Sequence, residues 1–371
     1  MRIIGATVLE YRRTLDGRSW NPTMRWSERR APLLMLRADD GTTGIGEAWS
    51  RQAEIDRVLA HLARVAPRLV GMNVDAVAFA PASDPKWVAP AAASAVDIAL
   101  WDLRSRAAQL PAWKWLATEP ARDGSVAVYA SGGLYRDATT SADLARELAG
   151  YVEDGFEAVK MKIGALPLPD DLDRVRAVRA AIGPGTTLWV DAVEQLSAAT
   201  APSWCAALSE FGVAAIQAPV PSSDIDTMAL VNRTLPVIAA EGEHTHARFA
   251  ALLDANAVTY LQFCLGLCGG AAGGSRLDAL AHDRGIASTP QCFSTAIMQA
   301  ASLHFGAARS NVGVVEFHRF HDHLADLMPP TMRTVVDGRV RLGEAPGLGL
   351  DPLSLGLQAD GGEIVVHGAF R

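Results

Sequence analysis

The stretch AVKMKIG at residues 158–164 decides the fold of this chain. Side chains of a β-strand alternate between two faces, so Lys160 and Lys162 share one face and the apolar residues of the stretch share the other. An isolated Lys-x-Lys match is ordinarily a solvated pair on an exposed strand. The neighbouring sequence therefore has to show whether these lysines face solvent or the interior of a larger sheet.

Eight short apolar runs alternate with Ala-, Leu- and Arg-rich stretches of helical spacing between residues 126 and 317. They are VAVYA at 126–130, AVKMKI at 158–163, TLWVD at 187–191, VAAIQ at 213–217, PVIAAE at 236–241, VTYLQFC at 258–264, IASTPQ at 286–291 and VGVVEF at 312–317. Alternating strands and helices form right-handed βα crossovers, and eight strands close a barrel, although an open sheet permits the same spacing. We predict an α/β fold with a (β/α)7β TIM-like barrel. The outward face of each strand must pack on helices, so both lysines point inward.

The segments on either side of the barrel predict a second, α+β domain. PLLMLRADDGTTGIGEA at 32–48 is a hairpin with an Asp-Gly turn, and residues 54–70 and 91–110 carry apolar residues at helical spacing. After residue 317 the chain is rich in Pro and Gly and ends in a short strand, EIVVH. We predict a capping domain at 1–122, the barrel at 123–330, and a C-terminal segment at 331–371 that returns to the capping domain.

The composition is that of a soluble globular protein, and nothing in it favours binding to nucleic acid or to an anionic membrane. The 371 residues are 49% hydrophobic and 20% charged, with a net charge of −7. The opening MRIIGATVLEYRRTL lacks the apolar run of a signal peptide, and no uncharged apolar stretch reaches the ~18 residues of a membrane span. The four cysteines are too few for a disulfide framework. We expect a cytoplasmic homo-oligomer with no nucleic-acid partner and no membrane association.

Two inward lysines at a strand end have a chemical use. Active sites of (β/α) barrels lie at the C-terminal ends of the strands, where Lys160 and Lys162 stand. Two neighbouring ammonium groups disfavour each other's charge, and burial adds to this effect, so we expect one lysine to have a depressed pKa. A lysine general base needs such a pKa near neutral pH.

This pattern of strand ends resembles the mandelate racemase/muconate lactonizing enzyme family of the enolase superfamily, in its mandelate racemase branch. ALWDLRSRAAQLP at 99–111, VYASGG at 128–133 and PGLGL at 346–350 extend the resemblance over nearly the whole chain. It implies Mg²⁺-assisted removal of the proton next to a carboxylate, since this superfamily uses a Lys or His base with Mg²⁺ to hold an enediolate. Lys162 then corresponds to the base and Lys160 to its substrate-contacting neighbour.

The resemblance also implies a metal site, and here the sequence departs from the family. Asp191 matches the first ligand, although it would equally serve as a helix cap. The second position, a carboxylate in the family, is Gln217, which lowers the site's charge and weakens Mg²⁺ binding or abolishes it. Glu241 matches the third ligand, with Glu243 as the alternative.

Two further departures concern the opposite face of the site. Gln291 stands where the family's seventh-strand histidine base would be, and Cys264 replaces the aspartate that orients it. Racemisation by a Lys and a His–Asp dyad is therefore unavailable. A thiol at Cys264 is either an acid on that face or, more commonly, a small buried hydrophobe.

The remaining candidates surround the expected substrate. Glu316 matches the family's eighth-strand glutamate, which hydrogen-bonds the substrate, and His318 lies just beyond it as a shielding or donating group. Trp20 and Arg25 fall in the segment where the family carries its specificity lid, where an arginine clamps a second carboxylate or sugar hydroxyls. A mobile surface loop explains them equally well.

We expect a small-molecule carboxylate substrate and, as the reaction, dehydration of an acid sugar or hydroxy acid, because one lysine can take a proton and return it to the leaving group. Epimerisation by the same family chemistry is the second alternative. A barrel that binds a metabolite without turning it over is the third, and Gln217, Gln291 and Cys264 favour it.

Overall fold

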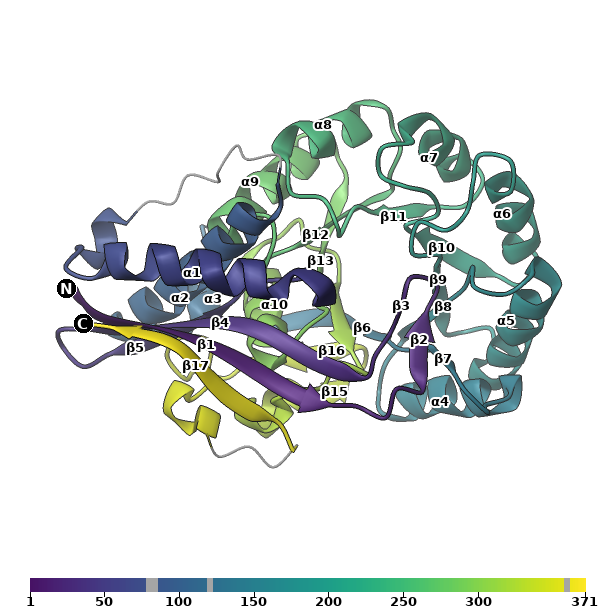
Figure 1. The fold of residues 1–371 in the computed structure, drawn as a ribbon. Helices are drawn as coiled ribbons and strands as arrows, with labels where there is room; N and C mark the ends of the chain where they lie inside the picture. Colours follow the sequence, from purple (N-terminus) through teal and green to yellow (C-terminus); the bar gives the residue numbers. More distant parts are fainter. Residues whose placement is uncertain (78–85, 119–122, 357–360) are drawn as a thin grey trace.

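The structure, a computed structural model, describes residues 1–77, 86–118, 123–356 and 361–371. It consists of a barrel surrounded by helices and an antiparallel sheet with its own helices, which packs against one side of the barrel (Figure 1). The predicted fold class, a (β/α)7β TIM-like barrel with an α+β N-terminal capping domain, is confirmed.

Eight parallel strands form the barrel within the described residues. They are β6 (Ser125–Ser131), β8 (Ala158–Lys162), β9 (Thr187–Asp191), β10 (Val213–Gln217), β11 (Val237–Ala239), β12 (Tyr260–Cys264), β13 (Ala287–Gln291) and β14 (Val315–His318). Each of the eight apolar runs overlaps one of these strands. β14 pairs with β6, and a parallel bridge between Ser288 and Val312 joins the β13 side to the segment before β14, so the sheet closes.

Seven helices connect these strands and cover the barrel from outside (Figure 1). They are α4 (Ser141–Glu153), α5 (Leu168–Ile182), α6 (Ala201–Ser209), α7 (Ile225–Asn232), α8 (His246–Asp254), α9 (Gly270–His282) and α10 (Ala296–Ala308). Outward strand residues such as Val159 and Met161 are fully buried under them. The alternation of β8 therefore places both lysines inside the barrel, as predicted.

The interior of the barrel is divided into an apolar layer and a polar layer. Tyr129, Trp189, Ala215 and Ile238 pack together as a separate buried cluster. Lys160 lies above this cluster, with its ammonium nitrogen 5.5 Å from the centre of the Tyr129 ring. The apolar cluster closes the bottom of the barrel, so the polar groups gather toward the C-terminal strand ends.

The capping domain is a four-stranded antiparallel sheet in the order β17-β1-β4-β5. Its elements are β1 (Ile3–Thr14), β4 (Glu28–Ala38), β5 (Thr43–Glu47), β17 (Glu363–Phe370), α1 (Ile55–Leu69) and α2 (Val88–Ala107). α2 lies so close to β5 that a Cβ on Gly46 would stand 2.1 Å from the carbonyl oxygen of Ala95. The glycines of the TGIGE strand therefore permit this helix to approach. The C-terminal strand β17 lies beside β1 (Figure 1).

The segment of Trp20 and Arg25, for which a mobile surface loop was one of the expectations, contains a small sheet. β2 (Ser19–Asn21) pairs with β3 (Met24–Arg25) and with β7 (Tyr135–Arg136), which follows the first barrel strand. The capping domain is thus hydrogen-bonded to the barrel at this point. The remaining short elements are η1 (Gln52–Glu54), η2 (Val74–Ala76), α3 (Ala112–Leu116), η3 (Ala325–Leu327), α11 (Pro330–Arg333), β15 (Val335–Val336), β16 (Arg339–Arg341) and η4 (Pro352–Gly356).

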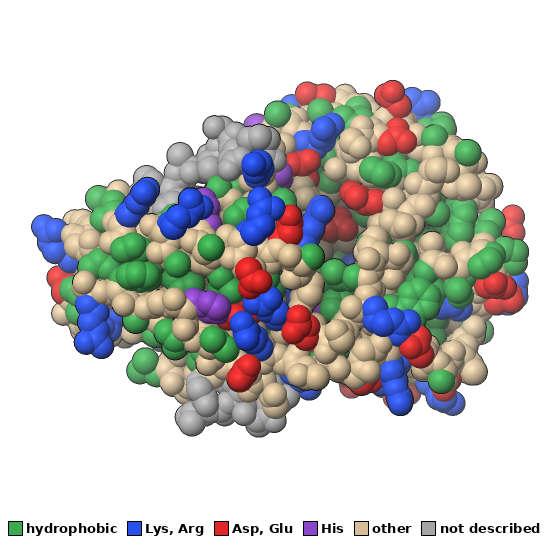
Figure 2. Space-filling model, viewed as in Figure 1, with side chains coloured by type: hydrophobic (Ala, Val, Ile, Leu, Met, Phe, Trp, Pro, Cys, Tyr) green, Lys and Arg blue, Asp and Glu red, His purple; other side chains and the backbone are tan. Residues whose placement is uncertain are grey.

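Charged side chains of both signs are interspersed on the face drawn in Figure 2. Among the helices of the described residues, none combines the length and the apolarity needed to cross a bilayer.

A buried histidine between the two domains predicts acid sensitivity. His304 of α10 is 1% exposed, and its Nδ1 accepts a hydrogen bond from the backbone N–H of Trp113 (3.2 Å). Burial lowers the pKa of His304 to about 3. The unfolded chain, with a histidine pKa of about 6.5, binds the proton first, so this stabilisation is complete above pH 6.5 and is lost as pH falls. Between pH 6.5 and 4.5 the loss should be about 2.3 kcal/mol, because half of the unfolded histidine is already protonated at pH 6.5.

Urea unfolding at several pH values measures this effect. The wild-type protein should lose about 2–3 kcal/mol more over that interval than His304→Gln does. The exposed His282→Gln is the control and should keep the wild-type slope. Parallel curves for wild type and His304→Gln would contradict the assignment.

Candidate active site

Lys160 is the centre of a buried polar cluster at the barrel mouth. Its side chain is fully buried, and its ammonium nitrogen lies 2.5 Å from Gln217 Oε1, 2.7 Å from Glu316 Oε1 and 3.3 Å from Asp191 Oδ2. An ammonium group has three hydrogens to donate, so these three oxygens use all of them. Lys160 thereby joins three strand ends, those of β9, β10 and β14.

The pKa of Lys160 is shifted in the direction opposite to the one expected for a lysine beside another lysine. Burial alone would lower the pKa of Lys160, but the negative charges of Glu316 and Asp191, with Tyr129 contributing, raise it well above its usual value. The expectation took into account the positive charge of the neighbouring lysine, but not the carboxylates that contact Lys160 in the fold. Lys160 is a permanent cation in this site and not a proton acceptor.

Lys162 is placed differently from Lys160. It lies one pleat nearer the mouth, its side chain retains 8% exposure, and its ammonium nitrogen donates to Asp191 Oδ2 at 2.5 Å. Burial would raise the pKa of Asp191, but the charges of Lys162 and Lys160 outweigh it and lower that pKa. Asp191 does not cap the next helix, because α6 begins beyond Thr200. Of the two lysines, Lys162 is the one whose amine reaches the substrate side.

Gln217 and Glu241 extend the cluster to the next strand end. Burial, and after it the negative charge of Asp191, raises the pKa of Glu241 to about 7, while a hydrogen bond with the Gln217 side chain opposes this rise. The alternative residue, Glu243, accepts hydrogen bonds from the backbone N–H groups of His244 and Thr245 at 2.7 and 2.9 Å, at the start of α8. The structure thus brings Glu241 to the cluster, whereas Glu243 accepts hydrogen bonds within the turn that precedes α8.

Glu316 is fixed from three sides. Its Oε1 accepts from Lys160, its Oε2 accepts from the backbone N–H of Cys292 at 3.1 Å, and its backbone carbonyl accepts from Gln299 Nε2 at 2.9 Å. Gln299 belongs to α10, so this helix holds the end of β14 in place. The side chain of Glu316 therefore faces the cluster in one defined orientation.

Cys264 and Gln291 lie side by side at the ends of β12 and β13, since the register pairs them directly. Cys264 is fully buried, and burial raises the pKa of its thiol to about 12. This environment matches the small buried hydrophobe among its two predicted roles. Gln291 is 8% exposed, and its Oε1 has no hydrogen-bond partner among the described residues.

Trp20 and Arg25 are not brought to the cluster. The Arg25 guanidinium binds Asp137 through two hydrogen bonds of 2.5 and 3.0 Å, and Trp20 Nε1 donates to the same carboxylate at 3.1 Å. The Trp20 ring stacks on Tyr135 with 4.6 Å between ring centres. These residues fasten the capping domain to the loop after β6, so the expected carboxylate clamp at Arg25 is already occupied by Asp137.

Two other residues of the capping domain reach the mouth instead. Trp26 is 2% exposed and packs against Phe293 and His321, with ring centres 6.1 and 5.5 Å away. The buried Arg29 donates to Phe293 O at 2.6 Å and to Ser294 Oγ at 2.7 Å, both in the segment after β13. Their signal in the sequence was weak, because a Trp and an Arg in a polar segment do not reveal a contact with residues so distant in the chain.

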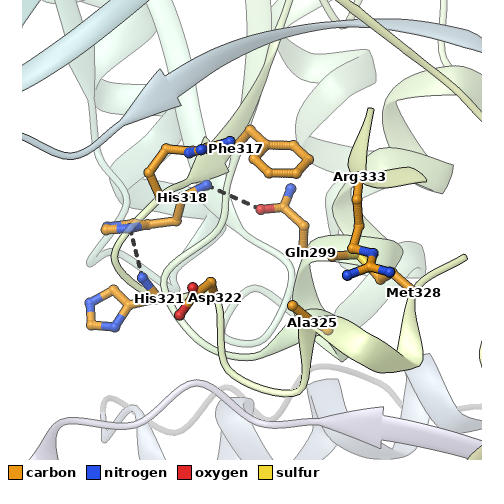
Figure 3. A pocket seen from close by; sticks show the side chains of 10 residues that line it. Gln299, Phe317, His318, His321, Asp322, Ala325, Met328 and Arg333 are labelled. Carbon is orange, nitrogen blue, oxygen red and sulfur yellow. Dashed lines mark hydrogen bonds between the residues drawn. The ribbon is translucent and has the colours of Figure 1, made fainter. Parts of the chain in front are cut away.

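His318 follows Glu316 on the same face of β14 and lies at the mouth. Its Nδ1 accepts hydrogen bonds from the backbone N–H groups of Phe320 and His321, each at 3.2 Å, and its own backbone N–H donates to Gln299 Oε1 at 3.2 Å (Figure 3). The cavity drawn in Figure 3, about 180 Å³, lies behind this strand end, between α10 and the segment that follows β14.

A (β/α)7β barrel with a capping domain, and with Lys-x-Lys, Asp and Glu converging at its strand ends, defines the enolase class of fold and site. Residues 20–117 match the family described as mandelate racemase / muconate lactonizing enzyme, N-terminal domain, and residues 143–354 match enolase C-terminal domain-like. The chain belongs to the mandelate racemase/muconate lactonizing enzyme family of the enolase superfamily.

Relatives of known activity are distant. D-galactarolactone cycloisomerase of Agrobacterium fabrum is 30% identical, over 93% of this chain and 94% of that protein. Arabinonate dehydratase of Saccharolobus solfataricus is 27% identical, over 71% of this chain and 70% of that protein. A racemase from Streptomyces coelicolor, solved with bound magnesium, superposes with a TM-score of 0.82 at 26% identity, over 94% of this chain and 97% of the other.

Proposed function

We propose that this protein removes the proton next to the carboxylate of an acid sugar and then expels the oxygen on the neighbouring carbon, in a dehydratase reaction. The observation that carries this proposal is the arrangement of the two lysines. Lys160 is a buried permanent cation joined to Glu316 and Asp191, whereas Lys162 alone presents its amine at the mouth. A fixed positive charge beside a single accessible amine is suited to forming and holding an enediolate.

Unpartnered polar atoms on the inner wall support a hydroxyl-rich substrate. Ser131 Oγ, Gln262 Oε1, Thr289 Oγ1 and Gln291 Oε1 are buried and have no hydrogen-bond partner among the described residues. Buried polar atoms without a partner are costly, so groups of this kind normally meet a ligand or water. A polyhydroxylated acid offers donors and acceptors to such a wall, which an aromatic substrate lacks.

A single lysine on one face of the substrate can carry out the whole elimination. Lys162, as the free amine, takes the proton from the α-carbon, and the electron pair enters the enediolate. The α–β double bond forms as the β-carbon–oxygen bond breaks, and the ammonium of Lys162 returns its proton to the departing hydroxyl, which leaves as water. The enol product then becomes a 2-keto acid. This elimination is syn, and the absence of a base at Gln291 or Cys264 leaves no route to the other face.

Asp191, Gln217 and Glu241 are the residues that would hold Mg²⁺. All three offer hard oxygen donors from adjacent strand ends, as Mg²⁺ prefers. The charge of Asp191 raises the pKa of Glu241 in addition to burial, so the two carboxylates lie close enough to interact, and a hydrogen bond links Glu241 to Gln217. These residues therefore fit the metal that a solved relative contains. When bound there, Mg²⁺ supplies positive charge to the substrate carboxylate as negative charge develops.

The substitution Gln217→Glu should tighten Mg²⁺ binding by about tenfold or more, because it adds a third charged ligand to the set. Isothermal titration of the purified proteins with MgCl₂ measures the change. Gln291→Glu, the same substitution three strands away, is the matched control and should leave the affinity unchanged. Equal affinities for Gln217→Glu and wild type would remove Gln217 from the metal site.

A panel of aldonates, aldarates and their lactones, including arabinonate and D-galactarolactone, tests the reaction itself. With Mg²⁺ present, we expect at least one acid to give a 2-keto acid, detected by ¹H NMR and as its semicarbazone. Recovery of substrate epimerised at C2 would favour the epimerase alternative. Binding of panel members without any conversion would favour a non-catalytic barrel.

Elimination of a ring oxygen is a second candidate for the same site. A relative that matches 93% of this chain at 30% identity is named a cycloisomerase. Expulsion of a ring oxygen uses the same α-proton removal by Lys162 and differs only in the leaving group. In the panel, conversion of the lactone without conversion of open-chain acids would select this alternative.

A further inference from the structure

His318 is held as a donor and not as a base. Its Nδ1 accepts two backbone hydrogen bonds, from Phe320 and His321, so the ring hydrogen of the neutral form must be on Nε2 (Figure 3). With Nδ1 occupied, Nε2 is the ring nitrogen that remains to donate, and the side chain is only 3% exposed. Burial and the charges of Lys162 and Lys160 lower the pKa of His318 well below its usual value, so the ring stays neutral.

The position of His318 places this donor beside the reacting groups. It stands two residues after Glu316 on the same strand face, and the register sets it level with Ser131, which is itself level with Lys160. The ring is clamped by Phe293 and His321, with ring centres 6.0 and 4.4 Å away. The backbone of His318 is held by Gln299 of α10 at 3.2 Å. Both the orientation and the tautomer are therefore determined before any substrate binds.

We propose that His318 donates its Nε2 hydrogen bond to the β-oxygen of the substrate and thereby assists its departure, a role that rests on the proposed function. Glu316, which the Lys160 ammonium group reaches, lies one pleat deeper on β14, where the α-carboxylate end of the substrate would bind. His318 lies one pleat nearer the mouth than Glu316, where the β-carbon of the bound substrate would be. The neutral ring donates a hydrogen bond and transfers no proton, so the proton that completes water still comes from Lys162.

The sign of the nearby charges agrees with this role. A neutral imidazole beside two lysines and Arg29 lies in a positive field, which favours an oxygen that gains negative charge as its bond to carbon breaks. Removing one such preorganised donor typically costs 10²–10³ in rate. His318 does not supply a base on the substrate face opposite Lys162, so the proposed elimination remains syn.

Two variants separate a catalytic donor from a structural ring. His318→Phe keeps a planar ring against Phe293 and loses the donor, whereas His318→Gln retains an N–H at a similar distance from the backbone. The probe is arabinonate, or the panel member that the wild type converts fastest, in D₂O with Mg²⁺. Deuterium at C2 of recovered substrate and 2-keto acid formation are followed in the same NMR tube. His321→Phe serves as the control for changes in ring packing.

We expect His318→Phe to form product about 10²–10³-fold more slowly while α-deuteration of recovered substrate continues, because the enediolate still forms but returns to substrate. His318→Gln should recover at least about tenfold of the lost product rate. Exchange and elimination falling by the same factor in both variants would overturn the role of His318 and leave the proposed function standing. Wild-type protein that neither exchanges nor eliminates would instead overturn the proposed function, and this inference with it.

Discussion

Lys162→Ala should lower product formation by at least about 10³-fold while the protein remains folded. Under the proposed function the amine of Lys162 is the base that removes the α-proton, and a positioned general base contributes about 10²–10⁴ in rate. Its side chain is 8% exposed and contacts Asp191, which keeps its contact with Lys160 in the variant. Steady-state turnover of the panel substrate and a thermal melt measure the two parts of this expectation.

A second variant at the same position tests the chemistry more sharply. Lys162→Arg keeps a positive charge for Asp191, but a guanidinium does not lose its proton at working pH. It should therefore be as inactive as Lys162→Ala and more stable. Lys114→Ala, which removes an exposed partner of Glu344 in the capping domain, is the control and should retain full turnover. Substantial activity in Lys162→Arg would assign the base to another residue.

Lys160→Met should destabilise the protein by about 3–5 kcal/mol, the usual effect of removing one partner from a buried ion pair. Lys160 is fully buried and its ammonium group is the only cation within hydrogen-bonding distance of the Glu316 carboxylate among the described residues. The variant leaves that carboxylate buried without a counter-charge. Urea unfolding at neutral pH measures the loss.

The double variant Lys160→Met/Glu316→Gln distinguishes the unpaired charge from lost packing. If the unpaired carboxylate is the cause, neutralising it should restore at least about 1 kcal/mol relative to Lys160→Met, because contacting residues are energetically coupled. A loss below about 1 kcal/mol in the single variant would contradict the charge state assigned to Lys160.

The fold was predictable because barrel strands are buried on both faces. Such strands appear as short apolar runs, and each predicted run overlaps an observed strand, for example TLWVD and β9 (Thr187–Asp191). The strand ends follow directly from these runs, so the sequence alone assigns Lys160, Lys162, Asp191 and Glu316 to one end of the barrel.

The properties that depend on several distant residues were not predictable. The raised pKa of Lys160 results from carboxylates on strands far apart in the sequence, and the sequence showed only its neighbour Lys162. Glu241 and Glu243 are two residues apart, and only the folded backbone shows that Glu243 accepts hydrogen bonds within the turn before α8. Contacts between the two domains could not be predicted from the sequence either. Arg25 was expected at the substrate, but it is Arg29 that contacts the segment after β13.

The departures from the family pattern have a consistent chemical meaning under the proposed function. Gln291 and the buried Cys264 leave the face opposite Lys162 without a base, which favours syn elimination over epimerisation. Gln217 weakens the proposed metal site without removing its oxygen donor. The cluster around Lys160 supplies a fixed positive charge on its own, so part of the electrostatic stabilisation does not depend on the metal.

The central claim, that Lys162 removes a proton next to a carboxylate, is tested most directly by the C2 proton of an acid sugar in D₂O. With the wild-type protein and Mg²⁺, the C2 proton signal of a panel substrate should be lost together with formation of the 2-keto acid. The same signal should persist unchanged with Lys162→Ala. A C2 proton retained by the wild type, with binding of that substrate demonstrated in the same sample, would contradict the account.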